Sequence, residues 1–193
     1  MGDVETALER FAAGSDDGQW HLDQRMMLAV TVVDPDGSPC GTWRALNEAV
    51  VEKRESGHTV NLLVRIDGEP FTSYAADGII VSTPTGSTAY ALSGGGPIVH
   101  PSINAINLVP INPHTLSNRP IVVDGDSRLE VTIEQENSVL PQVVCDGQIY
   151  LPAERGDRLV VHKKLQMVSL LHPVQHDFYE TCRTKLHWAS DQS

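Results

Sequence analysis

Residues 59–67 read TVNLLVRID, and every second residue from Val60 to Ile66 is aliphatic. These aliphatic side chains share one face of an extended chain, because successive side chains of a strand point to opposite sides. The run closes at Asp67-Gly68, a pair typical of a tight turn. The stretch therefore predicts a β-strand with one buried face, followed by a turn.

Similar runs recur along the chain and are separated by turn signals such as Asp146-Gly147. Their short, regular spacing favours antiparallel sheets over repeated βαβ units. We predict a mainly β fold, an antiparallel two-layer sandwich-like domain with a few short helices. We expect a first helix at 3–13, a second at 87–93 and a closing helix at 175–186. The expected strands are 27–33, 45–53, 59–67, 78–82, 106–111, 127–135, 142–145, 158–162 and 167–171.

Composition restricts the class of partner. The chain has 193 residues, 40% hydrophobic and 20% charged, with a formal net charge of −11. An acidic chain of this kind is unsuited to nucleic acid or an anionic membrane, both of which need a basic face. The three cysteines have no disulfide or metal spacing, and neither a membrane-spanning run nor a leader is present. We therefore expect a cytoplasmic protein that binds no nucleic acid and no membrane.

Residues 77–97 read DGIIVSTPTGSTAYALSGGGP. An apolar strand runs into a loop of hydroxyl residues, proline and glycine, which opens a short helix with Ser87 as the expected N-cap. Gly94–Gly96 permit positive φ and close approach of a ligand to the backbone. Such a loop offers many donors to a phosphate-bearing ligand, although the lysine of a P-loop is absent. From the residues alone, a tight connection chosen for packing explains the stretch equally well.

An Asn47-Glu48 pair interrupts the otherwise apolar strand expected at 45–53. Burying such groups without partners costs roughly 1–3 kcal/mol each, so they face either solvent or a ligand. An amide suits the edge of an adenine and a carboxylate suits a ribose diol. The residues alone favour a solvent-facing edge. Residues 110–117 form a rigid loop whose single histidine, His114, is more often structural than functional.

Several blocks together resemble the NAD kinase family. The most specific is TPTGSTAY at 83–90 with GGGPIV at 94–99, and LNE at 46–48 and PINPHTLSNRPIV at 110–122 add to it. The likeness covers nearly the whole chain and points to the C-terminal domain of that family. It implies that residues 1–25 are a helix and linker leading from another domain, 26–174 the NAD-binding β domain and 175–193 a C-terminal helix and tail.

The resemblance implies phosphoryl transfer from ATP or polyphosphate to the 2′-hydroxyl of the NAD adenosine ribose, with Mg²⁺ accompanying the donor. Asn47 and Glu48 would then hold the adenosine and its ribose, and Asp77 the nicotinamide end. Ala75 stands where many relatives carry a basic residue, so one anchoring charge is absent or comes from elsewhere. The remaining residues implied to line the site are Thr88, Ala89, Tyr90, Ser93, His58, Asn112 and Gln148.

Family members carry a Gly-Gly-Asp-Gly-Thr motif in an N-terminal domain, and its aspartate activates the acceptor hydroxyl. The motif does not occur in this sequence. The resemblance therefore implies that this chain holds no catalytic residue, needs its own N-terminal domain as a partner and is nearly inactive alone. It also implies a homodimer or homotetramer. Two other interpretations stay open: a non-catalytic dinucleotide-binding or assembly module, and a related lipid kinase domain.

Overall fold

A computed structural model describes residues 20–54, 58–115 and 117–188. The helix predicted at 3–13 and the linker after it lie outside these residues. Contacts divide the chain into two units, one of Met1–Gln24 with Ser169–Ser193 and one of Arg25–Val168. The larger unit contains both large sheets and every residue of the candidate site.

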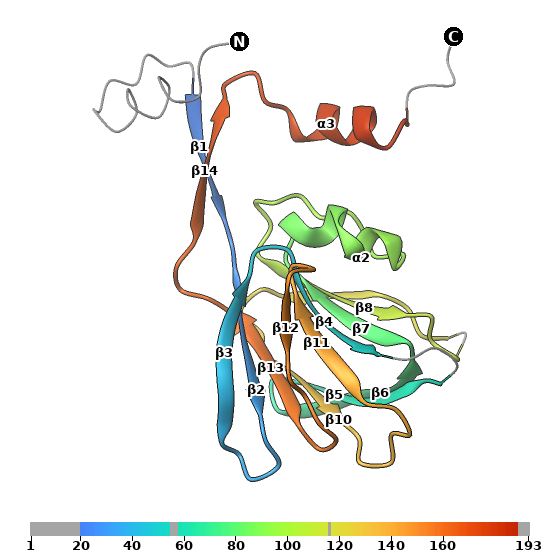
Figure 1. The fold of residues 1–193 in the computed structure, drawn as a ribbon. Helices are drawn as coiled ribbons and strands as arrows, with labels where there is room; N and C mark the ends of the chain where they lie inside the picture. The colour runs from blue at the N-terminus through green and yellow to red at the C-terminus, as the bar shows by residue number, and fades with distance from the viewer. Residues whose placement is uncertain (1–19, 55–57, 116, 189–193) are drawn as a thin grey trace. The chain divides into compact units, whose positions relative to one another are not determined.

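The strands follow the chain in short steps (Figure 1). Their bounds are β1 Trp20–Arg25, β2 Leu28–Val33, β3 Pro39–Ala45, β4 Glu48–Lys53, β5 Val60–Ile66, β6 Glu69–Ala76, β7 Gly78–Ser82, β8 Ala105–Ile111, β9 Ile121–Asp124, β10 Leu129–Ile133, β11 Pro141–Cys145, β12 Ile149–Leu151, β13 Arg158–Lys163 and β14 Val168–Pro173. The helices are the 3-10 helix η1 Thr85–Thr88, α2 Tyr90–Ser93 and α3 Phe178–Lys185.

Two six-stranded sheets form the larger unit, with orders β3-β2-β13-β10-β5-β6 and β12-β11-β4-β7-β8-β9. Every neighbouring pair within them is antiparallel. The prediction of a mainly β, antiparallel two-layer fold with few helices is therefore confirmed. In the smaller unit, β1 pairs with β14 and α3 begins after Asp177, whose side chain accepts the N–H groups of Tyr179 and Glu180.

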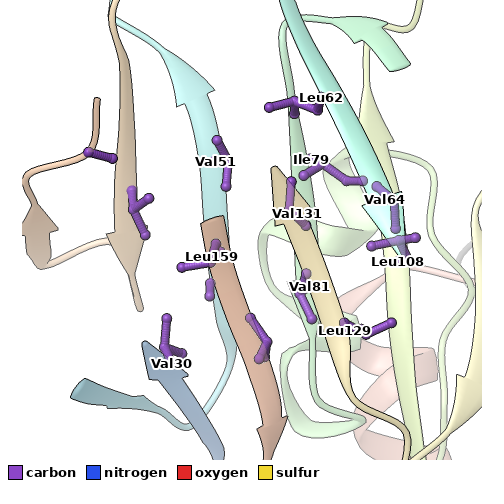
Figure 2. Packing of buried hydrophobic residues seen from close by; sticks show 14 of the residues in the cluster. Val30, Val51, Leu62, Val64, Ile79, Val81, Leu108, Leu129, Val131 and Leu159 are labelled. Carbon is purple, nitrogen blue, oxygen red and sulfur yellow. The ribbon is translucent and has the colours of Figure 1, made fainter. Parts of the chain in front are cut away.

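The core lies between the two sheets (Figure 2). Val51, Ile79 and Leu108 from the second sheet face Leu62 and Leu129 from the first, and each is fully buried. The alternation that predicted the strand at 59–67 therefore describes the inner face of β5. Burying an aliphatic side chain of this size contributes about 1.5–3 kcal/mol, so this interface is the main source of stability.

A second, smaller apolar cluster covers the outer face of the second sheet, where Val50, Ile80 and Val109 pack with Ala91 of α2. The helix predicted at 87–93 is therefore present as two shorter pieces, η1 and α2. Among the described residues, no helix is long and apolar enough to cross a membrane.

Two predictions about local structure are wrong in detail. The single strand expected at 45–53 is broken by a bend at Leu46 and Asn47, so Asn47 precedes β4 rather than lying inside it. Ser87 is not an N-cap, because it is buried within η1 and its hydroxyl donates to the carbonyl of Pro84 at 2.6 Å. Of the three glycines after α2, only Gly95 has a positive φ, of 82°.

Candidate functional site

The bend at Asn47 is held by a carboxylate from a distant part of the sequence. Asp146 accepts the backbone N–H of Leu46 through Oδ2 at 2.8 Å, and through Oδ1 those of Asn47 at 2.8 Å and Glu48 at 3.0 Å. In return, its own N–H donates to the carbonyl of Glu48 at 3.0 Å. Asp146 can reach them because it opens the β11–β12 turn with a positive φ of 50°, a conformation that Asp tolerates.

The strand–loop–helix segment supports the same bend from its other side. The Thr83 hydroxyl donates to the carbonyl of Leu46 at 2.6 Å and accepts the N–H of Gly86 at 3.1 Å, while the Thr83 N–H donates to the carbonyl of Asn47 at 2.8 Å. A Cβ at Gly86 would overlap that carbonyl, so only glycine fits there. Two of the three motifs noted in the sequence therefore meet at Asn47.

Glu48 begins β4 and is 5% exposed. Its Oε2 is buried without a hydrogen-bond partner among the described residues. Burial, and secondly the charge of Asp146, raise the pKa of Glu48 to about 7. Because an unpaired buried oxygen is costly, this carboxyl group is suited to accept hydroxyl donors from a ligand.

Asp77 lies at the far end of the same strands, where β6 gives way to β7. Its Oδ1 is 2.5 Å from Lys53 Nζ, and its Oδ2 accepts Asn112 Nδ2 at 3.1 Å. The hydrogen bonds from Lys53 and then Asn112 lower the pKa of Asp77, so the group is a fixed carboxylate. His114 joins this end through its backbone N–H, which donates to the carbonyl of Ala75 at 2.9 Å.

The predicted site residues thus fall into two groups along β4. Glu48 pairs with Ser82 at one end of β4, and Glu52 pairs with Gly78 at the other end. Asp77, the residue before Gly78, therefore lies opposite Lys53. Five residue steps of about 3.3 Å separate Glu48 from Lys53, which is roughly 17 Å. The Asn47 group and the Asp77 group therefore lie at opposite ends of β4.

Of the other predicted residues, the described contacts place Gln148 beside the Asn47 group and Ala75 and Tyr90 near the Asp77 group. Gln148 follows Asp146 in the β11–β12 turn and is exposed, and His58, also exposed, precedes β5. Tyr90 is 40% exposed, and the charges of Glu52 and Asp77 add to burial in raising its pKa. Thr88 and Ser93 are exposed, and Ala89 and Ala75 are half-buried.

A metal site built from protein ligands does not fit the part of the chain that the structure describes. No group of three or more His, Cys, Asp or Glu there is arranged to hold an ion. Mg²⁺ commonly keeps several waters and is held by one or two carboxylates together with substrate phosphates.

Comparison with known sequences shows the family to which this chain belongs. Residues 46–172 match the family described as the ATP-NAD kinase C-terminal domain. The chain belongs to this family. It is 47% identical over 171 residues to an NAD kinase of Cellvibrio japonicus, covering 89% of this chain and 57% of that protein. It is 48% identical over 174 residues to an NAD kinase of Ectopseudomonas mendocina, covering 90% and 59%.

Solved structures give the same family. The crystal structure of yeast NADH kinase complexed with NADH matches with a TM-score of 0.87 and 26% identity, covering 98% of this chain and 56% of that one. An NAD kinase from Archaeoglobus fulgidus in complex with ATP matches with a TM-score of 0.69 and 27% identity, covering 90% and 62%. The chain thus spans less than two thirds of the length of these relatives.

Sequence reasoning missed the residues that hold the site in shape. Asp146 was recognised only as part of a turn, and Lys53 only as the end of a strand. Their partners lie 99 residues away (Asn47) and 24 residues away (Asp77). A signal for Lys53 does exist, because it carries a charge at the end of an apolar strand whose neighbour in the sheet starts beside an aspartate.

Proposed function

We propose that this chain is the dinucleotide-binding part of an NAD kinase, which transfers a phosphoryl group from ATP or polyphosphate to the 2′-hydroxyl of the NAD adenosine ribose. The observation that carries the proposal is the fixed Asn47–Glu48 bend. It presents an amide beside a buried carboxyl oxygen that has no partner among the described residues. An amide and a carboxyl group together provide the donors and acceptors that an adenine edge and a ribose diol require.

The second group supports a ligand with two polar ends. Asp77 is a fixed, partly exposed carboxylate roughly 17 Å from Glu48, at about 3.3 Å per residue of β4. We infer that the adenosine binds at Asn47 and Glu48 and that Asp77, with Asn112, accepts donors from the nicotinamide riboside. Thr88, Ala89, Tyr90 and Ser93 would line the path, with Tyr90 as a stacking surface, and His58, Ala75 and Gln148 would lie at its margins.

Catalysis is proposed for a longer protein of which this domain is one part. Mg²⁺ would enter with the phosphate donor, and the base that activates the acceptor hydroxyl would come from an N-terminal domain of the kind described above. The role of this chain is to bind and orient the acceptor, a contribution that can account for much of the rate in phosphoryl transfer.

We also infer a homodimer or homotetramer. Tyr150 is 65% exposed and Ile149 42% exposed on β12, and Val122 is 48% exposed on β9. These strands form the two edges of the second sheet, and apolar side chains on an open edge favour association with another chain. Light scattering during gel filtration tests this inference, and a monomer at micromolar concentration would contradict it.

The experiment that tests the function is NADP formation from NAD and Mg-ATP. The part of the Cellvibrio japonicus NAD kinase that this chain does not cover would be joined to it. We expect the fusion to form NADP and an Asn47→Ala/Glu48→Ala fusion to be at least 100-fold slower. A fusion that binds both nucleotides yet forms no NADP would favour the non-catalytic module instead.

A further inference from the structure

Asp77 is the middle member of a row of three residues at the ends of neighbouring strands: Lys53 ends β4, Asp77 precedes β7 and Asn112 follows β8. Glu52 pairs with Gly78, and Gly78 pairs with Ile111. One step further, Lys53 lies opposite Asp77 and Asp77 lies opposite Asn112. The backbone bonds continue this register, since the Lys53 N–H donates to the Asp77 carbonyl at 3.0 Å and the Asp77 N–H to the Ile111 carbonyl at 2.9 Å.

The side chains of the row meet at the Asp77 carboxylate. Lys53 Nζ contacts Oδ1 at 2.5 Å and Asn112 Nδ2 donates to Oδ2 at 3.1 Å, so each oxygen has one partner and the two partners come from opposite sides. A carboxylate has about four acceptor positions, so roughly two stay open. The Asp77 side chain is 28% exposed, which leaves it accessible to a ligand.

Asn112 is itself held in an unusual backbone conformation, with a φ of 43°. Asparagine tolerates this region better than other residues with a side chain, and the conformation requires support from its surroundings. Support comes from the bond between Asn112 and Asp77 and from the bond of the His114 N–H to the carbonyl of Ala75. The row is therefore built to fix the direction of one carboxylate.

The pair contributes more to geometry than to stability. Partly exposed ion pairs contribute little to folding, because solvent screens them and both side chains lose freedom. Lys53 is 21% exposed and its charge is already matched by Asp77 at contact distance, so it is poorly placed to bind a second anion. Its effect is exerted through the carboxylate that it touches.

We propose that Lys53 is a positioning residue for the dinucleotide, which together with Asn112 fixes the Asp77 carboxylate so that its open lone pairs accept hydroxyl or amide donors of the nicotinamide riboside. This inference rests on the proposed function.

The charged and titratable groups that act with Asp77 come from several elements. Lys53 and Glu52 lie on β4, Tyr90 on α2, and His114 on the loop after β8. The hydrogen bonds from Lys53 and then Asn112 lower the pKa of Asp77, and the charges of Lys53 and His114 act in the same direction. Removing the ammonium group should therefore raise the pKa of Asp77 and release one of its oxygens.

The test is calorimetric titration of NAD into the 193-residue chain and its Lys53→Met, Lys53→Arg, Asp77→Asn and Lys53→Met/Asp77→Asn variants. We expect Lys53→Met to weaken NAD binding about fivefold at pH 7, with a larger deficit at pH 5, and Lys53→Arg to restore binding at both. Once Asp77 is Asn, Lys53→Met should change the affinity less than twofold, because its action passes through the carboxylate.

An equal loss from Lys53→Met in both backgrounds would overturn the inference, since it would mean that Lys53 acts on the ligand without Asp77. Unchanged affinity in Lys53→Met would overturn it as well. The Asn47→Ala variant separates this failure from failure of the proposed function. If Lys53→Met gives either of these results while the parent chain binds NAD and Asn47→Ala does not, only the role of Lys53 is wrong. If the folded parent chain does not bind NAD, both fail.

Discussion

Asp146 fixes the backbone of Asn47 across 99 residues of sequence, with its Oδ1 accepting the Asn47 N–H at 2.8 Å. The same carboxylate also accepts the N–H groups of Leu46 and Glu48. A bend between two strands would otherwise leave these donors without strand partners. The direction of the Asn47 and Glu48 side chains therefore depends on a residue that does not need to touch the ligand.

Replacing Asp146 tests this dependence. Asp146→Asn keeps a residue that tolerates positive φ but removes one acceptor oxygen and places an amide donor against backbone donors. We expect roughly 2–3 kcal/mol of lost stability, because hydrogen bonds to a charged group are strong and unpaired N–H groups are costly. NAD affinity should fall at least tenfold. Urea unfolding and calorimetry measure the two effects.

Asp67 provides a matched control. It opens the β5–β6 turn with a φ of 53°, and its Oδ1 accepts the N–H of Arg128 at 2.8 Å, away from the candidate site. Asp67→Asn should lower stability without changing NAD affinity. If Asp67→Asn and Asp146→Asn weakened NAD binding equally, the special role of Asp146 would be wrong.

The raised pKa of Glu48 predicts how NAD affinity depends on pH. Burial, and then the charge of Asp146, raise this pKa to about 7, and only the ionised carboxylate accepts two ribose hydroxyls. Affinity should therefore increase as pH rises from 6 to 8, by up to about tenfold per unit below the pKa. Calorimetry at several pH values measures this, and Glu48→Gln should bind weakly and show a flatter profile. A profile unaltered by Glu48→Gln would rule out Glu48 as its source.

The same group predicts the opposite trend for stability. The pKa of Glu48 is about 7 when folded against 4.5 as the reference, so between these values the folded chain holds a proton that the unfolded chain has lost. Stability should fall as pH rises from 4.5 through 7, by about 1–3 kcal/mol from this group. Subtracting the urea-unfolding profile of Glu48→Gln from that of the parent chain isolates the effect.

Gly86 provides a steric test of the contact between η1 and the bend. A Cβ at this position would overlap the carbonyl of Asn47, which cannot move without breaking its bond from the Thr83 N–H and the bond from the Glu48 N–H to Asp146. We expect Gly86→Ala to weaken NAD binding by more than tenfold and to lower stability by about 1–3 kcal/mol, as overpacking commonly does.

Gly94→Ala is the control that separates an effect on the bend from a general loss of stability. Its Cβ would meet Val109 Cγ1 at 2.9 Å, at the far end of α2. It should lower stability by a similar amount while leaving NAD affinity within about threefold, since overpacking acts locally. Equal losses of affinity in the two variants would show that η1 has no specific role at the bend.

Cysteine reactivity tests the sandwich itself. Cys145 is fully buried between the sheets, and burial, with the charge of Asp146, raises its pKa to about 12, whereas Cys40 is exposed. The thiolate is the reactive form, so a maleimide should label Cys40 quickly and Cys145 only after unfolding. Mass spectrometry of the labelled peptides measures this. Fast labelling of Cys145 in the folded chain would contradict the packing.

The sequence predicted the strands that face the core, because alternation records burial on one side of a sheet. It missed β1, β3, β6, β9 and β12, and the last four of these form the edges of the two six-stranded sheets. Glu69-Pro70 begins β6, and β12 has only three residues, so neither stretch carries a clear pattern. Edge strands depend on one neighbour and on pairing partners that the local sequence does not reveal.

The sequence singled out Asn47 and Glu48 of the candidate site but not the residues that hold them in place. Asn47 and Glu48 stood out because polar residues interrupt an apolar run. Ser87 was expected to cap a helix because its local position allowed it, yet its hydroxyl accepts the N–H of Val99, twelve residues on, at 3.0 Å. Contacts of this kind depend on the folded arrangement, so a single sequence does not predict them.

The most direct test of the account is calorimetric titration of NAD into the 193-residue chain, beside an Asn47→Ala/Glu48→Ala variant whose fold is checked by circular dichroism. The account predicts saturable binding to the parent chain and at least a 100-fold loss in the variant. A folded parent chain that does not bind NAD, or a variant that binds it equally well, would contradict the claim that the Asn47–Glu48 bend is the acceptor site of an NAD kinase.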